Sequence, residues 1–296
     1  MKINDLDSWA QSHFDYFLDA VRIYLGVGLV FKGISFLTHH ELLTALNGTA
    51  LSGLAPIVPY IHIVGGALLA IGFLPRIAAL VNIPVLLAAV FMVHTPELHT
   101  LRGREGFEFS ALVLFLLCII AVRGAGPLSV AALWKRSTTH PSMFPLQRWS
   151  DAHTDVLADA IRIYLGVGLF IKGMYIMDHR DEILSMVGGA NFSFPMVAAA
   201  HYVIPAHLVG GVLLACGILT RWAAAAQIPP LIAAIFYAFL PRFTQLEMRQ
   251  SLEFTTLVLF LLALIFVFGD GRLSLEHAGR KRVIISPDLQ PSPTRV

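Results

Sequence analysis

A ten-residue segment of this chain occurs twice, and this repeat constrains the fold more than any other feature. The segment AVRIYLGVGL at residues 20–29 recurs as AIRIYLGVGL at residues 160–169, with nine identities in ten positions. The match continues on both sides, and each half closes with a Gly-x-Gly-x-Leu-Ser segment, at residues 124–129 and 269–274. Similarity of this extent indicates an internal duplication. The chain should therefore contain two units of one fold.

Each half carries four long apolar segments, which predict a membrane protein. They lie near residues 17–37, 57–74, 77–94, 107–123, 157–177, 203–219, 222–240 and 252–268. Of the 296 residues, 56% are hydrophobic and only 14% are charged, with a mean hydropathy of +0.72, whereas soluble domains carry about a quarter charged residues. A helix of about 18 residues spans a hydrocarbon core of about 30 Å if it is upright or the bilayer is thinned. We predict an all-α integral membrane protein with eight transmembrane helices.

The even number of segments in each half predicts how the two units are related. After four crossings the chain returns to the side from which it started, so both four-helix bundles should be parallel, with a pseudo-two-fold axis along the membrane normal. We place the first unit at residues 1–134, a polar linker at 135–152, the second unit at 153–275 and a cytoplasmic tail at 276–296.

The distribution of basic residues outside these segments predicts the orientation, because cytoplasmic loops are enriched in Lys and Arg. One face carries twelve of them: Lys2, Arg76, Arg123, Lys135, Arg136, Arg148, Arg221, Arg272, Arg280, Lys281, Arg282 and Arg295. The opposite face carries five: Arg102, Arg104, Arg180, Arg242 and Arg249. We therefore expect both termini in the cytoplasm, in a bacterial-type cytoplasmic membrane. The polar N-terminal residues predict no cleaved signal peptide.

Several function classes lack support in the sequence. The net charge is +2 and the longest basic run is Arg280-Lys281-Arg282, so nucleic acid is not an expected partner, and this triplet fits a membrane-side anchor or a solvated tail. Cys118 and Cys216 lie in apolar runs and do not correspond between the halves. Since Cys clusters, Rossmann glycines and the haem-attachment motif are missing, we expect no covalently bound cofactor and no haem.

Ionisable residues inside apolar segments are costly, and they mark the first helix of each half. Towards the inner end this helix carries Asp19 and Arg22, repeated as Asp159 and Arg162, and towards the outer end Lys32, repeated as Lys172. These Lys and Arg side chains either extend to the two membrane surfaces or face the interior of the bundle.

The outer ends of the helices should bring a second set of polar residues to one depth. The set contains Lys32, His39, His62 and Glu108 in the first half, and Lys172, His179, His207 and Glu253 in the second. A Lys–Glu pair would offset the cost of burying either charge, and the histidines could complete a hydrogen-bond network. Three interpretations remain open: a stabilising network, a site for a ligand or for protons, and a metal site that would use His62, His94 and His99.

The residues of both halves resemble the DoxX/DoxD family. The similarity lies in Arg22, Gly26 and Gly33 of the first helix, in the Gly-Gly-x-x-Leu-x-x-Gly-x-x-x-Arg pattern from Gly65 to Arg76, in Glu108, and in the closing segment at 124–129; all recur in the second half. Where the family often has an acidic residue before the Gly-Gly pair, this chain has His62 and His207.

The resemblance implies a four-helix membrane unit that works with redox systems. Some members of the family are the membrane subunit of thiosulfate:quinone oxidoreductase, and others associate with sulfurtransferase or oxidative-defence proteins. We therefore expect a membrane subunit of a quinone-linked oxidoreductase, with a protein partner and with a quinone or a small anion bound by Lys32, His62 and Glu108 and their counterparts. The alternatives are a scaffold subunit without catalytic activity and a permease for small solutes.

Overall fold

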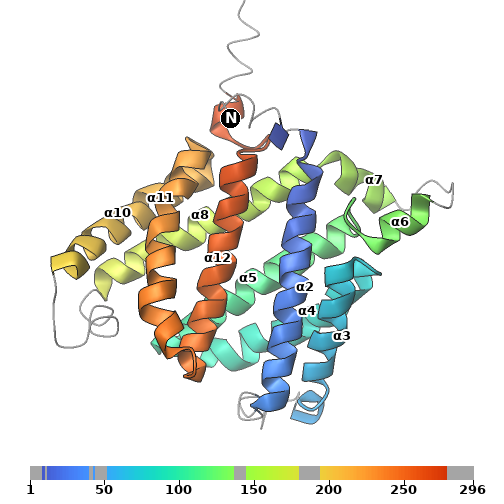
Figure 1. The fold of residues 1–296 in the computed structure, drawn as a ribbon, viewed down its shortest axis with the longest axis horizontal. Helices are drawn as coiled ribbons and strands as arrows, with labels where there is room; N and C mark the ends of the chain where they lie inside the picture. Colours follow the sequence, from blue (N-terminus) through green and yellow to red (C-terminus); the bar gives the residue numbers. More distant parts are fainter. Residues whose placement is uncertain are drawn as a thin grey trace, which may run out of the picture. The chain divides into compact units, whose positions relative to one another are not determined.

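The computed structural model describes residues 9–10, 12–39, 43, 52–136, 145–179 and 194–278, and the regular secondary structure within these ranges is helical. The first half forms α2 (Asp15–Thr38), α3 (Val58–Ile71), α4 (Pro75–Ala88) and α5 (Leu101–Arg123). The short helices α6 (Val130–Arg136) and α7 (Pro145–Ala152) follow. The second half forms α8 (Thr154–Asp178), α10 (Phe194–Cys216), α11 (Thr220–Ala233) and α12 (Leu246–Phe268) (Figure 1).

Six helical segments among the described residues are long and apolar enough to cross a membrane, so the chain is a multi-pass membrane protein. They are Asp15–Thr38, Pro75–Glu97, Gly103–Arg123, Thr154–Asp178, Thr220–Arg242 and Met248–Phe268. The other two predicted spans coincide with shorter apolar helices, Val58–Ile71 and His201–Cys216. Fourteen residues in α3 extend only about 21 Å, because Gly72 ends the helix in a left-handed conformation (φ 71°).

Two of the long segments change their helical pitch near their C-terminal ends, which the apolar pattern does not predict. After α4 the chain continues as a π-helix over Ala89–His94 and a 3₁₀ turn over Thr95–Glu97, and after α11 it repeats this over Ala234–Phe239 and Leu240–Arg242. Each 3₁₀ turn contains a proline, Pro96 or Pro241. A proline ring clashes with the carbonyl four residues earlier, and a wider turn relieves that clash.

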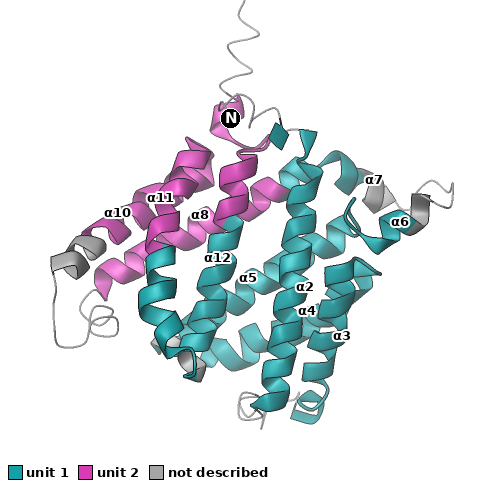
Figure 2. Cartoon of the chain, viewed as in Figure 1, with its two compact units in different colours: residues 1–157, 231–261 teal, residues 158–230, 262–296 magenta. Residues whose placement is uncertain are grey.

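The compact units of the structure do not follow the boundary between the two repeats. One unit comprises residues 1–157 and 231–261, and the other comprises residues 158–230 and 262–296 (Figure 2). The first unit thus includes the beginning of α12 from the second repeat. Residues 279–296 of the predicted tail and residues 137–144 of the predicted linker lie outside the described residues.

Paired glycines let two helices of each unit approach closely. A Cβ added to Gly66 of α3 would lie 2.6 Å from the carbonyl oxygen of Gly26 in α2, and one added to Gly211 of α10 would lie 2.8 Å from that of Gly166 in α8. Small residues at helix crossings permit this packing in membranes. By contrast, a Cβ on Gly28 would meet open space.

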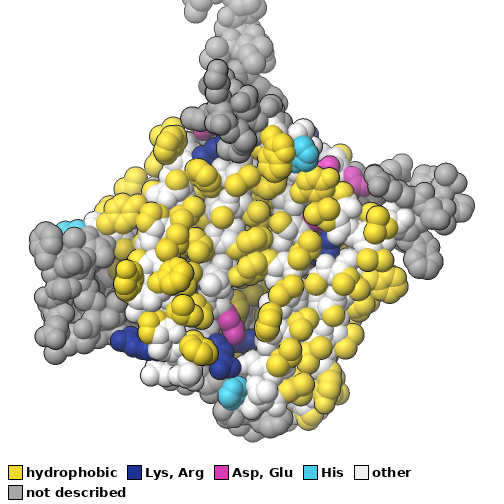
Figure 3. Space-filling view, in the orientation of Figure 1, with side chains coloured by type: hydrophobic (Ala, Val, Ile, Leu, Met, Phe, Trp, Pro, Cys, Tyr) yellow, Lys and Arg dark blue, Asp and Glu magenta, His cyan; other side chains and the backbone are white. Residues whose placement is uncertain are grey.

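The outward surfaces of the helices are strongly apolar. Phe31, Leu80, Phe91, Trp222 and Tyr237 are all more than half exposed, and Figure 3 shows apolar side chains spread over the visible face of the helices. Exposed apolar surface of this extent is characteristic of contact with lipid.

Candidate functional site

A buried Asp–Arg pair ties three segments together at the predicted inner end of the first unit. Arg22 is 1% exposed, and its Nε donates to Asp19 Oδ1 over 3.2 Å. Its Nη1 donates to the carbonyls of Leu69 (2.5 Å) and Ala70 (3.0 Å) at the end of α3. Its Nη2 donates to Leu128 O (2.8 Å), while Leu128 N donates to Asp19 Oδ2 (2.6 Å). The guanidinium thus satisfies carbonyls that a helix C-terminus leaves unpaired, where positive charge is also favoured.

The second unit contains the same arrangement, built from Asp159 and Arg162. Arg162 Nε donates to Asp159 Oδ1 over 2.9 Å, and Nη1 donates to the carbonyls of Leu214 (2.5 Å) and Ala215 (2.9 Å) at the end of α10. Leu273 closes the group, because its N–H donates to Asp159 Oδ2 over 2.7 Å. We call these two groups the Asp–Arg knots. Both arginine side chains are only 1% exposed, and every polar atom in these bonds is engaged in holding segments of the unit together.

The predicted outer end of the first unit holds an ion pair between the two repeats. Lys32 Nζ of α2 lies 2.9 Å from Glu253 Oε2 of α12, and the two side chains are only 21% and 29% exposed. The expected Lys–Glu pair therefore forms, and in this unit its acidic partner comes from the other repeat.

Aromatic rings surround this ion pair. Lys32 Nζ lies 5.7 Å from the ring centroid of Phe36 and 5.6 Å from that of Phe109. The ring of Phe109 is in turn 5.9 Å from that of Phe254. A cation held between aromatic faces is stabilised by their electron density, and such faces can also stack on a planar ligand.

His62 packs against Phe36, one of these aromatic residues. It is 4% exposed, its ring centroid is 5.7 Å from that of Phe36, and its Nδ1 has no hydrogen-bond partner among the described residues. A buried polar atom without a partner costs free energy, and it often marks a site that is completed by a ligand or by water. Lys32, Glu253 and His62, with Phe36 and Phe109, form what we call the outer site.

The remaining predicted residues have other neighbours. Glu108 pairs with Arg104 one turn away, with 3.3 Å between Arg104 Nε and Glu108 Oε1. Lys172 lies over the ring of Tyr175, which stacks on His179 at 4.2 Å. His207 is buried in α10, and His39 ends α2 with its N–H bonded to Ser35 O. Several predicted surface charges, including Arg180 and Arg280–Arg282, lie outside the described residues.

The described residues contain no group of three His, Cys, Asp or Glu side chains that could hold a metal ion. This applies to His62, His94 and His99, which were the candidate ligands. His94 instead lies against Gly106, where an added Cβ would strike its ring.

Sequence reasoning missed several polar residues of the helix crossings. Ser251 of α12 donates to Glu105 Oε2 of α5 over 2.6 Å, a second link between the repeats in the first unit. Asn82 and Gln227, at equivalent positions of α4 and α11, are fully buried. An amide inside an apolar run was a usable signal for both, because a buried amide has to find hydrogen-bond partners.

Comparison with known proteins identifies the family of this chain. No curated protein and no solved structure matches it. The family model DoxX matches twice, over residues 17–95 and 157–240, which together make up more than half of the sequence. Each match includes one Asp–Arg pair, one membrane lysine and one buried histidine. The chain therefore belongs to the DoxX family and carries that family's unit in tandem.

Proposed function

We propose that this chain is the membrane subunit of a quinone-linked oxidoreductase and binds the quinone headgroup at the outer site. The observation that carries the proposal is the Lys32–Glu253 ion pair inside a membrane helix bundle, with Lys32 over two aromatic rings and with His62 nearby, whose Nδ1 lacks a hydrogen-bond partner among the described residues. An intramembrane ionisable residue is expensive, and such residues commonly mark functional sites.

The chemistry of the outer site suits a quinone. The Phe36 and Phe109 rings offer faces on which a planar headgroup can stack. Lys32 would stabilise negative charge that develops on a quinone oxygen, and His62 and Glu253 would hold the protons that accompany reduction. Because the sequence carries no redox cofactor motif, the electrons would come from a partner protein.

Titration of the purified protein with a short-chain ubiquinone or menaquinone analogue tests this proposal. We expect saturable binding that weakens at least tenfold in Lys32→Ala and in Glu253→Gln, since a lost charged hydrogen bond is worth about 1.5–3 kcal/mol. Arg104→Ala is the matched control, because it removes an outer cation that pairs with Glu108 outside the site. Non-saturable binding, or equal binding in all three variants, would count against a quinone site.

One observation favours a second candidate, a scaffold subunit without catalytic activity. The ion pair joins residues 221 positions apart and links the two repeats, which is what a purely stabilising contact would also do. A scaffold predicts that Lys32→Ala lowers the amount of folded protein while the quinone affinity of the remaining protein is unchanged. The titration therefore distinguishes the two functions.

We also propose the full topology: eight crossings, two parallel four-helix bundles and cytoplasmic termini, in a bacterial-type cytoplasmic membrane. The six long spans and the position of α3 and α10 between them support it. Labelling of single cysteines with a membrane-impermeant reagent in intact cells tests the orientation. A cysteine at His99 should react from outside, and one at Arg272 should react only after the membrane is opened.

A further inference from the structure

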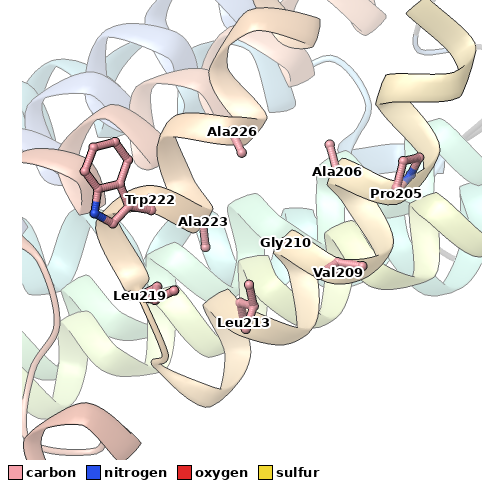
Figure 4. A pocket seen from close by; sticks show the side chains of 9 residues that line it. All are labelled: Pro205, Ala206, Val209, Gly210, Leu213, Leu219, Trp222, Ala223 and Ala226. Carbon is pink, nitrogen blue, oxygen red and sulfur yellow. The ribbon is translucent and has the colours of Figure 1, made fainter.

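An apolar groove runs between α10 and α11 in the second unit. It has a volume of about 230 Å³ and is lined by the following residues of the two helices and their turn: Pro205, Ala206, Val209, Gly210, Leu213, Leu219, Trp222, Ala223 and Ala226 (Figure 4). Eight residues of α10 separate its ends, a length of about 12 Å. All of the lining side chains are apolar.

The surroundings of the groove determine what can fill it. α11 begins the membrane-spanning segment Thr220–Arg242, so the groove opens to hydrocarbon. Water does not fill an apolar cavity, and a void would leave its lining without dispersion contacts on one side. The volume equals about eight water-sized groups at about 30 Å³ each. That room suits a segment of one hydrocarbon chain and is too small for a lipid headgroup with its chains.

The lining of the groove differs in part from the equivalent positions of the first repeat. Five lining positions carry the same residue in the first half, but Ala206 replaces Ile61 and Ala226 replaces Val81. At these two positions a β-branched side chain is reduced to a methyl group. Trp222, which replaces Ile77, is 68% exposed beside the α10–α11 turn. Tryptophan favours the boundary between hydrocarbon and water, so it would lie where a lipid headgroup continues from the chain.

Two hydrogen bonds join α10 and α11 and fix the distance between them, so the small side chains of Ala206 and Ala226 leave a space. The Gln227 side chain of α11 donates to Ala206 O of α10 over 2.5 Å, and the Tyr202 hydroxyl of α10 donates to Ala226 O of α11 over 2.7 Å. These bonds run in opposite directions between the helices, next to the two alanines. A closer approach of the helices would compress both bonds, so the two helices cannot close the groove by moving together.

We propose that this groove binds one acyl chain of a membrane phospholipid as a resident ligand of the second unit. The inference is independent of the quinone proposal, because the outer site lies in the first unit and shares no residue with the groove.

Fluorescence quenching of Trp222 by brominated lipid tests the proposal. Full-length protein in which Trp9, Trp134 and Trp149 are replaced by Phe is titrated in detergent with phosphatidylglycerol that carries brominated acyl chains. We expect quenching that saturates near one lipid per protein. Ala206→Ile with Ala226→Val, the residues that the first repeat carries, should weaken this binding about tenfold or more.

The controls separate occupancy from unfolding. Ala225→Val makes the same change one position along α11, outside the groove, and should leave the titration unchanged. The single variant Ala226→Val replaces the double variant if the latter unfolds, as judged by its thermal transition. Quenching that never saturates, or that is equal in the filled and unfilled proteins, overturns the proposal. Displacement of the brominated lipid by a long-chain quinone but not by unlabelled phospholipid overturns it as well.

Discussion

The helical hairpins α3–α4 and α10–α11 share a backbone plan and differ in how their helices are joined. Both turn through a left-handed glycine and leucine, Gly72 and Leu74 in one and Gly217 and Leu219 in the other. In the first hairpin, Asn82 Nδ2 bonds to Ala78 O of its own helix over 2.8 Å. In the second, the longer Gln227 reaches across to α10.

The difference between Asn82 and Gln227 shows which parts of the duplicated unit vary between its two copies. The Asp–Arg knots and the glycine crossings hold the backbone and are alike in both units. The surface between the hairpin helices is less constrained, because the buried amide and several side chains that line the groove differ between the two copies. New binding surfaces in this chain are thus expected where the two copies differ.

The largest expected effect concerns a feature that the two units share. Arg22→Leu and Arg162→Leu each leave a buried aspartate without its partner and the end of a helix without its cap, which should cost about 3–5 kcal/mol of unfolding free energy. Denaturant unfolding in detergent micelles measures both losses, and we expect them to be similar. A knot that contributes much less in one unit would show that the copies rely on different contacts.

The glycine crossings should rank second. Gly66→Ala and Gly211→Ala place a methyl group against backbone atoms less than 3 Å away, and such overpacking costs about 1–3 kcal/mol. Gly28→Ala and Gly168→Ala are the matched controls, since nothing lies within 4 Å of an added Cβ there. The controls should be neutral or stabilising by up to about 1 kcal/mol, because alanine favours helix. Equal melting temperatures for all four variants would contradict this packing.

The amide positions test the comparison directly. Gln227→Asn shortens the side chain so that the bond to Ala206 O is lost, at a cost of about 1 kcal/mol. The variant should also narrow the groove, which lowers the lipid affinity of the Trp222 reporter. Asn82→Ala, which removes only the bond to Ala78 O within α4, should leave that lipid affinity unchanged. A Gln227→Asn protein with unaltered stability and lipid binding would show that the bond does not set the helix spacing.

The smallest expected effect lies at the start of α5 and α12. Thr100 Oγ1 accepts a hydrogen bond from Gly103 N over 3.0 Å and caps α5, so Thr100→Ala should cost about 1 kcal/mol. The equivalent position before α12 holds Gln245, which is a poor capping residue. Gln245→Thr should therefore raise the melting temperature slightly. A gain at Gln245 with no loss at Thr100 would mean that the cap matters in one copy alone.

The sequence predicted the membrane class and the duplication, and its list of polar residues included Lys32, His62 and Glu253, which share the outer site with two unpredicted phenylalanines. It could not select the acidic partner of Lys32, because Glu108 and Glu253 each precede a phenylalanine at the same position of the repeat. The residues around the two glutamates are similar, so only tertiary packing decides which glutamate pairs with Lys32. The hydrogen-bond partners of Arg22 could not be predicted either, since they are carbonyls at the end of α3 and the sequence does not place that end next to Arg22.

Other features were outside the reach of apolar periodicity. A hydropathy pattern counts residues but does not register helical pitch, so the π-helices before Pro96 and Pro241 were not expected. The short length of α3 follows from the left-handed Gly72, whose conformation is set by its neighbours. The groove was also not expected, because the distance between α10 and α11 is fixed by the hydrogen bonds of Gln227 and Tyr202, which the sequence does not show.

The ion pair between α2 and α12 also has a consequence for biosynthesis. Lys32 and Glu253 are 221 residues apart, and ribosomes add about 5–20 residues per second, so roughly 11–44 seconds separate their synthesis. Throughout that interval the lysine of the newly inserted α2 has no Glu253 to neutralise it. The first unit of the protein is therefore completed late, when α12 leaves the ribosome.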